Sequence, residues 1–190
     1  MGIKKFEIGE VPRRDCSNCV TDIVKFRRNV VLGVGSLDSK VVFIGEAPGY
    51  EEDKQGVPFV GRAGEVLDYL LFKNDIERRD VYITNIVKCR PTLAGKNRKP
   101  DDSEVAVCSP FLLNELQRID PDIICPMGGV ALKFFDSSLS VSSFHGKIMK
   151  WKDKMMIPLY HPAVALYKKE ELPNMVEDMK VVARELEKVS

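Results

Sequence analysis

The chain has 190 residues, of which 44% are hydrophobic and 30% charged, and its formal net charge is +1. This balance is that of a soluble globular protein, and the length fits one domain with a core of its own. No apolar run approaches the roughly 18 residues of a membrane helix, and the N-terminus lacks the apolar stretch of a signal peptide. We therefore expect one domain over residues 1–190, in the cytoplasm and without a membrane partner.

The charge is unevenly spread. Nucleic-acid-binding proteins usually carry a basic surplus, so a net charge near zero is weak evidence against that class. One basic group nevertheless lies between positions 88 and 99, and Lys168-Lys169 form another. Local groups of this kind can give a neutral protein a basic face. On composition alone, solvated surface loops are the simpler interpretation.

Strands and helices alternate from residue 41 onward. Apolar runs predict buried strands over 41–44, 80–87, 122–126 and 155–160. Amphipathic patterns predict helices over 65–73, 101–119, 130–135 and 172–189. A short helix near 17–26 and a short extended piece at 141–144 are the weaker expectations. The alternation predicts an α/β fold with three αβα layers around a central, mostly parallel four-stranded sheet.

Polar groups follow the predicted strands at their carboxyl ends, where open parallel sheets bind ligands. Glu46 follows the first strand, Asn85 ends the second and His161 follows the fourth. The Gly128-Gly129 pair after the third strand leaves room for a ligand. The convergence of four segments is more specific than any one of them. No GxGxxG or phosphate-loop lysine motif is present, so no nucleotide cofactor is indicated.

The connection over residues 45–64 is long and rich in glycine and acidic residues. Such a connection is typical of a binding loop, although a solvated acidic loop is the alternative. Within it, we expect Glu51 and Asp53 at the surface.

The five cysteines favour metal binding or catalysis over disulfides in a cytoplasmic chain. Cys16 and Cys19 have the spacing of a metal half-site, whereas Cys89 and Cys108 stand alone. Spacing leaves zinc and an iron–sulfur cluster open. Cys108 lies on an apolar helix face and can equally be a core residue. We assign Cys125, inside an apolar strand, to the core.

Four motifs resemble those of family 4 uracil-DNA glycosylases, the iron–sulfur type of thermophilic archaea and bacteria. They are Gly45-Glu46-Ala47-Pro48-Gly49 with Pro58-Phe59-Val60-Gly61, the segment 84–91, Tyr160-His161-Pro162-Ala163, and the cysteines Cys16, Cys19, Cys89 and Cys108 in the order of the family's cluster ligands. The resemblance spans about residues 16–185.

The resemblance implies the uracil-DNA glycosylase fold and its reaction. Uracil would be flipped out of single- or double-stranded DNA, and its N-glycosidic bond would be hydrolysed to leave an abasic site. A 4Fe–4S cluster would tie down the N-terminal segment. The resemblance also implies a nucleoid-associated monomer, with a replication clamp as a candidate partner.

The resemblance further implies a role for each site residue. Glu46 would position or activate the attacking water, and His161 would stabilise the departing uracil. The uracil-binding residues would be Ala47, Glu52, Phe59, Asn85 and His161. The DNA-binding residues would be Arg62, Leu166, Tyr167 and Lys168, with Leu166 or Tyr167 as the wedge that fills the gap left by the base. The metal ligands would be Cys16, Cys19, Cys89 and Cys108.

Three departures from the family pattern affect this interpretation. Ala47 stands where better-known monofunctional relatives have Asp, and alanine cannot take a proton. A non-catalytic DNA-binding module on the same fold therefore stays open, as does a zinc-stabilised hydrolase of another small substrate. The gap between Cys89 and Cys108 is a few residues longer than the family pattern. The Arg-rich insert of relatives that bind uracil-DNA covalently is absent after His161, which favours turnover.

Overall fold

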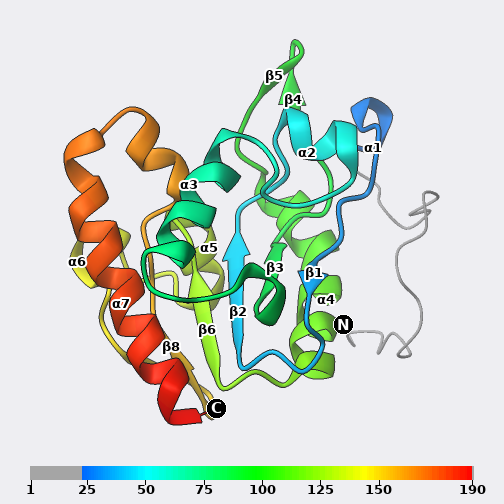
Figure 1. Ribbon diagram of the computed structural model, residues 1–190. Coiled ribbons are helices and arrows are strands. Elements are labelled where there is room, and N and C mark those ends of the chain that lie inside the picture. The colour runs from blue at the N-terminus through cyan, green and yellow to red at the C-terminus, as the bar shows by residue number, and fades with distance from the viewer. Residues whose placement is uncertain (1–22, 190) are drawn as a thin grey trace.

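The computed structural model of the chain describes residues 23–189, drawn in colour in Figure 1. The helices are α1 Ile23–Phe26, α2 Tyr50–Gln55, α3 Arg62–Phe72, α4 Asp102–Ile119, α5 Gly129–Phe135, α6 Val141–Phe144 and α7 Leu172–Val189, with the 3₁₀ helices η1 Arg78–Asp80, η2 Pro162–Leu166 and η3 Lys169–Glu171. The strands are β1 Val34–Gly35, β2 Val41–Gly45, β3 Tyr82–Asn85, β4 Thr92–Leu93, β5 Lys96–Asn97, β6 Ile123–Pro126, β7 Met149–Trp151 and β8 Lys154–Met156.

The main sheet has the strand order β1-β3-β2-β6-β8-β7. Its four central strands are parallel, and they are the four that the apolar runs predicted. The sheet has six strands rather than four because β1 and β7 add one antiparallel strand at each edge. These edge strands hold two and three residues, which is too short for a periodic signal.

Helices cover both faces of the sheet, so the predicted three-layer α/β fold is confirmed (Figure 1). Alternate residues of β2 enter different cores, because successive side chains of a strand point to opposite faces. Phe43 packs with Leu67 of α3 and Met179 of α7. Ile44 packs on the other face, in the cluster that contains Leu112 of α4. Cys125 of β6 is fully buried, as predicted for a core residue.

Two local predictions were wrong. The segment 141–144, expected to be extended, forms the short helix α6. The connection after β2 is not a continuous loop, because it contains α2. Gly49 lies at the N-terminal cap of α2, and Gly56 ends it in the left-handed conformation that glycine adopts most readily.

The expectation that Asp53 lies at the surface was also wrong. Asp53 is 1% exposed, on the inner side of α2. Its Oδ1 atom accepts hydrogen bonds from the backbone N–H groups of Arg28 (2.8 Å) and Asn29 (3.2 Å). The side-chain amide of Asn29 also donates to the backbone carbonyl of Asp53 at 2.7 Å. The carboxylate therefore fastens the segment before β1 to α2.

The carboxyl ends of the parallel strands face the same edge of the sheet. The β4–β5 hairpin projects beyond this edge, at the top of Figure 1. In the described part of the chain, no helix is both long and apolar enough to cross a membrane. The edge with the hairpin is where the polar residues that follow the strands meet.

Candidate active site

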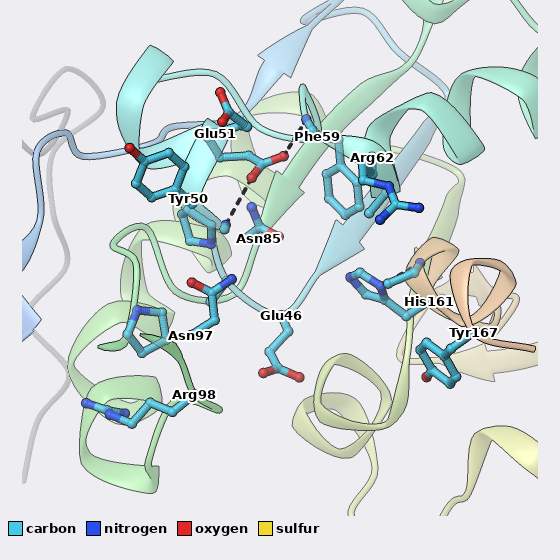
Figure 2. Close-up of a pocket in the computed structure, with 18 residues that line it drawn as sticks. Glu46, Tyr50, Glu51, Phe59, Arg62, Asn85, Asn97, Arg98, His161 and Tyr167 are labelled. Atoms are coloured by element: carbon cyan, nitrogen blue, oxygen red, sulfur yellow. Dashed lines mark hydrogen bonds between the residues drawn. The ribbon is translucent and has the colours of Figure 1, made fainter. Parts of the chain in front are cut away.

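A cleft of about 580 Å³ opens at the carboxyl edge of the sheet (Figure 2). Its walls come from the β2–α3 connection, the end of β3, the β4–β5 hairpin and the turn η2. Eight residues predicted from the sequence line it: Glu46, Ala47, Glu52, Phe59, Arg62, Asn85, His161 and Tyr167. Leu166 and Lys168, the neighbours of Tyr167, are not among the lining residues. Leu166 is half-buried in η2 and Lys168 is exposed.

Asn85 ends β3 and presents an unpaired oxygen. The residue is 2% exposed. In the described part of the chain, its Oδ1 is the one buried side-chain oxygen or nitrogen without a hydrogen-bond partner. Such an atom costs about 1–3 kcal/mol, which a ligand N–H group would recover. Gly45 makes room for the amide, because a Cβ there would collide with Oδ1 and lie 2.6 Å from Cζ of Phe59.

Phe59 adopts a backbone conformation that is rare for a bulky residue. Its φ angle is +53°, in the left-handed region. The Nη2 group of Arg78 donates to the carbonyls of Pro58 (3.1 Å) and Phe59 (3.0 Å). Gly64 is required beneath this turn, since a Cβ would collide with the Phe59 carbonyl. These contacts hold the ring beside Asn85, with its centroid 5.8 Å from that of His161.

Glu52 gives the loop its shape. One carboxylate oxygen, Oε1, accepts from the backbone N–H groups of Val60 (3.0 Å) and Gly61 (2.8 Å). The other accepts from Gly49 N–H at 3.1 Å. The dashed lines of Figure 2 mark the bonds from Gly49 and Gly61. Glu52 thus joins the start of α2 to the turn before α3, while a direct contact between Glu52 and uracil stays a prediction.

His161 presents a neutral ring to the cleft. Burial lowers its pKa to about 4, partly opposed by the negative charge of Glu52. The backbone N–H of Ala163 donates to Nδ1 at 3.2 Å, which assigns the ring proton to Nε2. Gly128 allows the close approach of the histidine, since its Cβ would lie 3.0 Å from the His161 Cβ. His161 is therefore a hydrogen-bond donor through Nε2 at neutral pH.

Glu46 points into the same space from the end of β2 (Figure 2). Desolvation raises the pKa of its carboxyl group above the ordinary value of 4.5, and the positive charge of Lys99 partly opposes this rise. The backbone carbonyl of Glu46 accepts from Val87 N–H at 3.1 Å, which fixes the main chain. None of the described residues donates a hydrogen bond to its carboxylate. The side chain is thus available to a ligand.

Lys88, which the sequence placed in the basic group between positions 88 and 99 and so at the surface, lies buried beneath the cleft. Lys88 is 0% exposed. Its Nζ donates to the Asn85 carbonyl at 2.7 Å, to Thr84 Oγ1 at 2.6 Å and to Glu115 Oε2 at 2.6 Å. Thr84 also donates to this Glu115 oxygen at 2.8 Å. The ammonium therefore has an acceptor for each of its protons, and one of them fixes the backbone of Asn85.

The sequence also missed three lining residues on one side of the cleft: Tyr50, Asn97 and Arg98. Tyr50 is 46% exposed and lies between two guanidinium groups, 5.4 Å from Arg28 and 5.1 Å from Arg90. Asn97 and Arg98 come from the β4–β5 hairpin. The Ala94-Gly95 turn was the signal that could have revealed this hairpin, whose strands have two residues each.

Comparison with known proteins shows the family to which the chain belongs. Residues 32–186 match the model of the Uracil DNA glycosylase superfamily. The chain is 48% identical over 143 residues to the Type-4 uracil-DNA glycosylase of Thermotoga maritima, covering 74% of this chain and 73% of that relative. It is 39% identical over 181 residues to the Type-4 uracil-DNA glycosylase of Sulfurisphaera tokodaii, covering 90% and 80%.

The chain belongs to the type-4 uracil-DNA glycosylase family. Among solved structures, that of SMUG2 from Pedobacter heparinus has a TM-score of 0.54 at 15% identity, over 80% of this chain and 77% of the other. At this identity the likeness shows a shared fold alone.

The type-4 resemblance predicted four cysteine ligands, of which Cys16 and Cys19 lie outside the described residues. The other two, Cys89 and Cys108, belong to the same hydrophobic cluster. The backbone N–H of Lys88 donates to Cys108 Sγ at 3.2 Å, and Arg27 donates to Cys89 Sγ at 3.0 Å. Donors to sulfur suit thiolate ligands of an iron–sulfur cluster. Within residues 23–189 no group of three metal-ligating side chains occurs, and two cysteines alone do not complete a site.

Replacing Lys88 by Met should destabilise the protein by about 3–5 kcal/mol, because Glu115 would lose its buried partner. Lys88→Met combined with Glu115→Gln should recover at least half of this loss, since the unpaired charge is then removed. Chemical denaturation of the purified protein measures both effects.

The exposed ion pair of Lys40 and Asp122 gives a control for this experiment. Lys40→Met should change the free energy of unfolding by no more than about 1 kcal/mol. A Lys88→Met variant as stable as the Lys40→Met variant would contradict the role of the buried network.

Proposed function

We propose that this protein is a DNA repair glycosylase, which flips uracil out of DNA and hydrolyses the bond between the base and deoxyribose. The buried, unpaired Oδ1 of Asn85, a residue that lines the cleft together with Phe59, carries the proposal. A site that already holds an unsatisfied acceptor discriminates strongly in favour of a ligand with the matching donor. The family relatives, named uracil-DNA glycosylases, support the same reaction.

Asn85 and Phe59 would recognise the base. The ring of Phe59 offers a face on which the flipped base stacks. The Asn85 amide would accept from uracil N3–H through Oδ1 and donate to O4 through Nδ2. Cytosine presents the opposite donors and acceptors at these two positions, so it would leave the buried amide mismatched. The Lys88 bond to the Asn85 carbonyl keeps the amide in place before the base arrives.

His161 would stabilise the leaving group. Breaking the N-glycosidic bond puts negative charge on uracil and positive charge on the sugar. A neutral imidazole with its proton on Nε2 donates to O2 of the departing base, on the logic of an oxyanion hole. Because the low pKa keeps the ring neutral, the histidine would act as a hydrogen-bond donor and not as a cation.

Glu46 would serve the sugar side of the reaction. An ionised carboxylate stabilises the cationic sugar and can position or deprotonate the attacking water. Ala47 contributes its backbone to the cleft wall but no acidic group. Glu46 is thus the carboxylate to which we assign the water, and its side chain points into the cleft from the end of β2 (Figure 2).

The DNA backbone would follow the rim of the cleft. Arg62 begins α3 at an exposed position, and Tyr167 is 71% exposed after η2. We propose Arg62 and Lys168 as phosphate contacts, with Tyr167 or Leu166 as the wedge. The substrate would be uracil in single- or double-stranded DNA. We also propose that the protein acts as a monomer at the nucleoid and that a replication clamp is a partner.

We further propose that a 4Fe–4S cluster is held by Cys16, Cys19, Cys89 and Cys108. The described half of this ligand set fits, because Cys108 Sγ lies within hydrogen-bond distance of the amide next to Cys89. Ile23, four positions after Cys19, packs in the same hydrophobic cluster as Cys89. The cluster would supply a structural cross-link between these segments.

Purified, cluster-loaded protein should release free uracil from single- and double-stranded oligonucleotides without an added cofactor. Asn85→Ala should reduce this release by a factor on the order of 10²–10³, because a preorganised hydrogen-bonding group is lost, and should change DNA affinity much less. Uracil release by chromatography and fluorescence anisotropy measure the two quantities.

Asn174→Ala, an exposed change on α7, is the matched control and should leave both quantities unaltered. Tight DNA binding by wild-type protein without any uracil release would favour the non-catalytic module instead. Equal losses of uracil release and DNA affinity in Asn85→Ala would contradict the assignment of Asn85 to base recognition.

The rate of uracil release should fall at acid pH through the protonation of Glu46. Its pKa is raised by desolvation, so the ionised form is lost as the pH falls through a value above 4.5. His161 stays neutral down to about pH 4, so the rate should show no second decline near pH 6.5. Rates measured from pH 4.5 to 8 should show a single acid limb, which is absent in Glu46→Gln.

Glu65→Gln, an exposed change on α3, should keep the wild-type profile. A limb near pH 6.5 that disappears in His161→Gln but survives in Glu46→Gln would reverse the two assignments.

The cluster proposal predicts a brown protein whose iron and sulfide contents match one 4Fe–4S centre. Cys89→Ser should lose the colour and bound iron, whereas Cys125→Ser should keep both, because Cys125 belongs to the core. A colourless wild-type protein with stoichiometric zinc would overturn the iron–sulfur assignment and favour the zinc alternative. Metal analysis and the visible spectrum decide between them.

A further inference from the structure

The β4–β5 hairpin is a small, well-defined projection. Thr92 pairs with Asn97 and Leu93 with Lys96, in antiparallel register. The connecting residues have left-handed backbones, with φ angles of +49° at Ala94 and +77° at Gly95. Two consecutive positive φ angles are typical of the type I′ turn, whose twist suits a two-residue hairpin. The hairpin stands beyond the carboxyl edge of the sheet, at the top of Figure 1.

Hydrogen bonds hold the hairpin in place. Arg90 donates to Asn97 Oδ1 at 2.6 Å and to the Gly95 carbonyl at 3.0 Å. At its base, Arg98 forms two hydrogen bonds with the buried carboxylate of Glu104, at 2.6 and 2.7 Å. Arg98 also donates to the Thr92 carbonyl at 3.3 Å. A projection braced in this way keeps its shape when it meets a partner.

The tip of the hairpin presents an apolar and a basic side chain together. Leu93 is 71% exposed, and its cross-strand partner Lys96 is exposed as well. Lys96 forms no ion pair with any residue in the described part of the chain. No acidic residue occurs between positions 89 and 100. An exposed leucine beside unneutralised positive charge suits a DNA duplex, which offers phosphates and apolar sugar and base surfaces.

The hairpin is also continuous with the cleft. Asn97 lines the cleft, and it lies on the other side of Glu46 from Tyr167 in Figure 2. Because neighbouring residues of a strand point to opposite faces, Leu93 and Lys96 lie on the face away from Asn97. The Leu93–Lys96 pair lies one residue, or about 3.4 Å, nearer the hairpin tip than the Thr92–Asn97 pair. One nucleotide step along a DNA strand has about the same length.

We infer that the β4–β5 hairpin is a second DNA-binding element, which grips the duplex beside the flipped nucleotide. Lys96 contacts a phosphate, and Leu93 packs against the sugar and base edge of the adjacent nucleotide. The inference rests on the proposed function, which places the flipped base in the cleft. It explains the extra length between Cys89 and Cys108, because the additional residues form the projecting tip. The hairpin and the Tyr167 turn then hold the DNA from opposite rims.

The experiment compares uracil release from a duplex with release from the same strand alone, at enzyme concentrations below saturation. The variants are Leu93→Ala and Lys96→Ala in the full chain. The controls are Phe72→Ala, which is 76% exposed at the end of α3 away from the cleft, and Lys150→Ala, on the exposed edge strand β7. Affinity for an undamaged duplex is measured in parallel at several salt concentrations.

Leu93→Ala should lower release from the duplex by on the order of tenfold and release from the single strand by much less. Lys96→Ala should lower the slope of log affinity against log salt by about 0.9, the value for one phosphate contact on duplex DNA. Both controls should behave as wild type.

Variants that match the controls on both substrates would overturn the inference. So would equal losses on duplex and single strand, because the contact would then not involve flanking duplex. If the wild-type protein released no uracil, the proposed function would fail, and the salt-dependent duplex affinity of Lys96→Ala alone would still test the hairpin.

Discussion

The buried ammonium group of Lys88 is the constraint on which the site depends. Placing a lysine at 0% exposure costs several kcal/mol, and only the acceptors around it make this position tolerable. Those acceptors are the Glu115 carboxylate of α4, the Thr84 hydroxyl and the Asn85 carbonyl. The end of β3 is thereby pinned to α4. Asn85, three residues before Lys88, lines the cleft, and Cys89, the residue after Lys88, is one of the proposed cluster ligands. The proposed base-recognition and cluster sites therefore share one short segment, and a cross-link at Cys89 would act on the same backbone that positions the amide.

Unfavourable local features gather around the cleft, and a rigid surrounding structure maintains each of them. Phe59 has a left-handed backbone, Asn85 has an unpaired buried oxygen and His161 is too buried to charge readily. The Glu52 carboxylate and the Arg78 guanidinium hold the loop that carries Phe59, although neither needs to touch a substrate. Strain and unsatisfied polar groups persist at functional sites because the surrounding structure over-determines them. The substrate would satisfy the unpaired oxygen of Asn85 by supplying the N–H group that the site lacks.

The sequence predicted the elements that depend on apolar periodicity. It did not predict the features that depend on a single tertiary contact. The four central strands and the long helices were predicted, because a run such as Val41–Ile44 must be buried whatever surrounds it. The edge strands and the β4–β5 hairpin were missed, because two or three residues show no period. Asp53 and Lys88 are charged residues that composition assigns to the surface. Their burial depends on partners distant in sequence, the backbone at Arg28 and the carboxylate of Glu115, which no local pattern reveals. The eight predicted residues that line the cleft came from motifs and strand ends, whereas Tyr50 and Asn97 depended on tertiary folding.

The geometry of the cleft also suggests how the proposed reaction would proceed with alanine, and no acidic group, at position 47. A second carboxylate there would lie next to Glu46, in a cleft where desolvation already raises the pKa of one acid. Two neighbouring carboxylates in such a place tend to share a proton, which leaves one of them neutral. With Ala47, Glu46 has no carboxylate on the next residue of the chain, and Lys99 favours its ionised form. His161, neutral and fixed as an Nε2 donor, adds no positive charge that would pair with it. In the proposed reaction, Glu46 would face the cationic sugar and the neutral His161 would donate to the departing base, which suits the charges that develop as the glycosidic bond breaks.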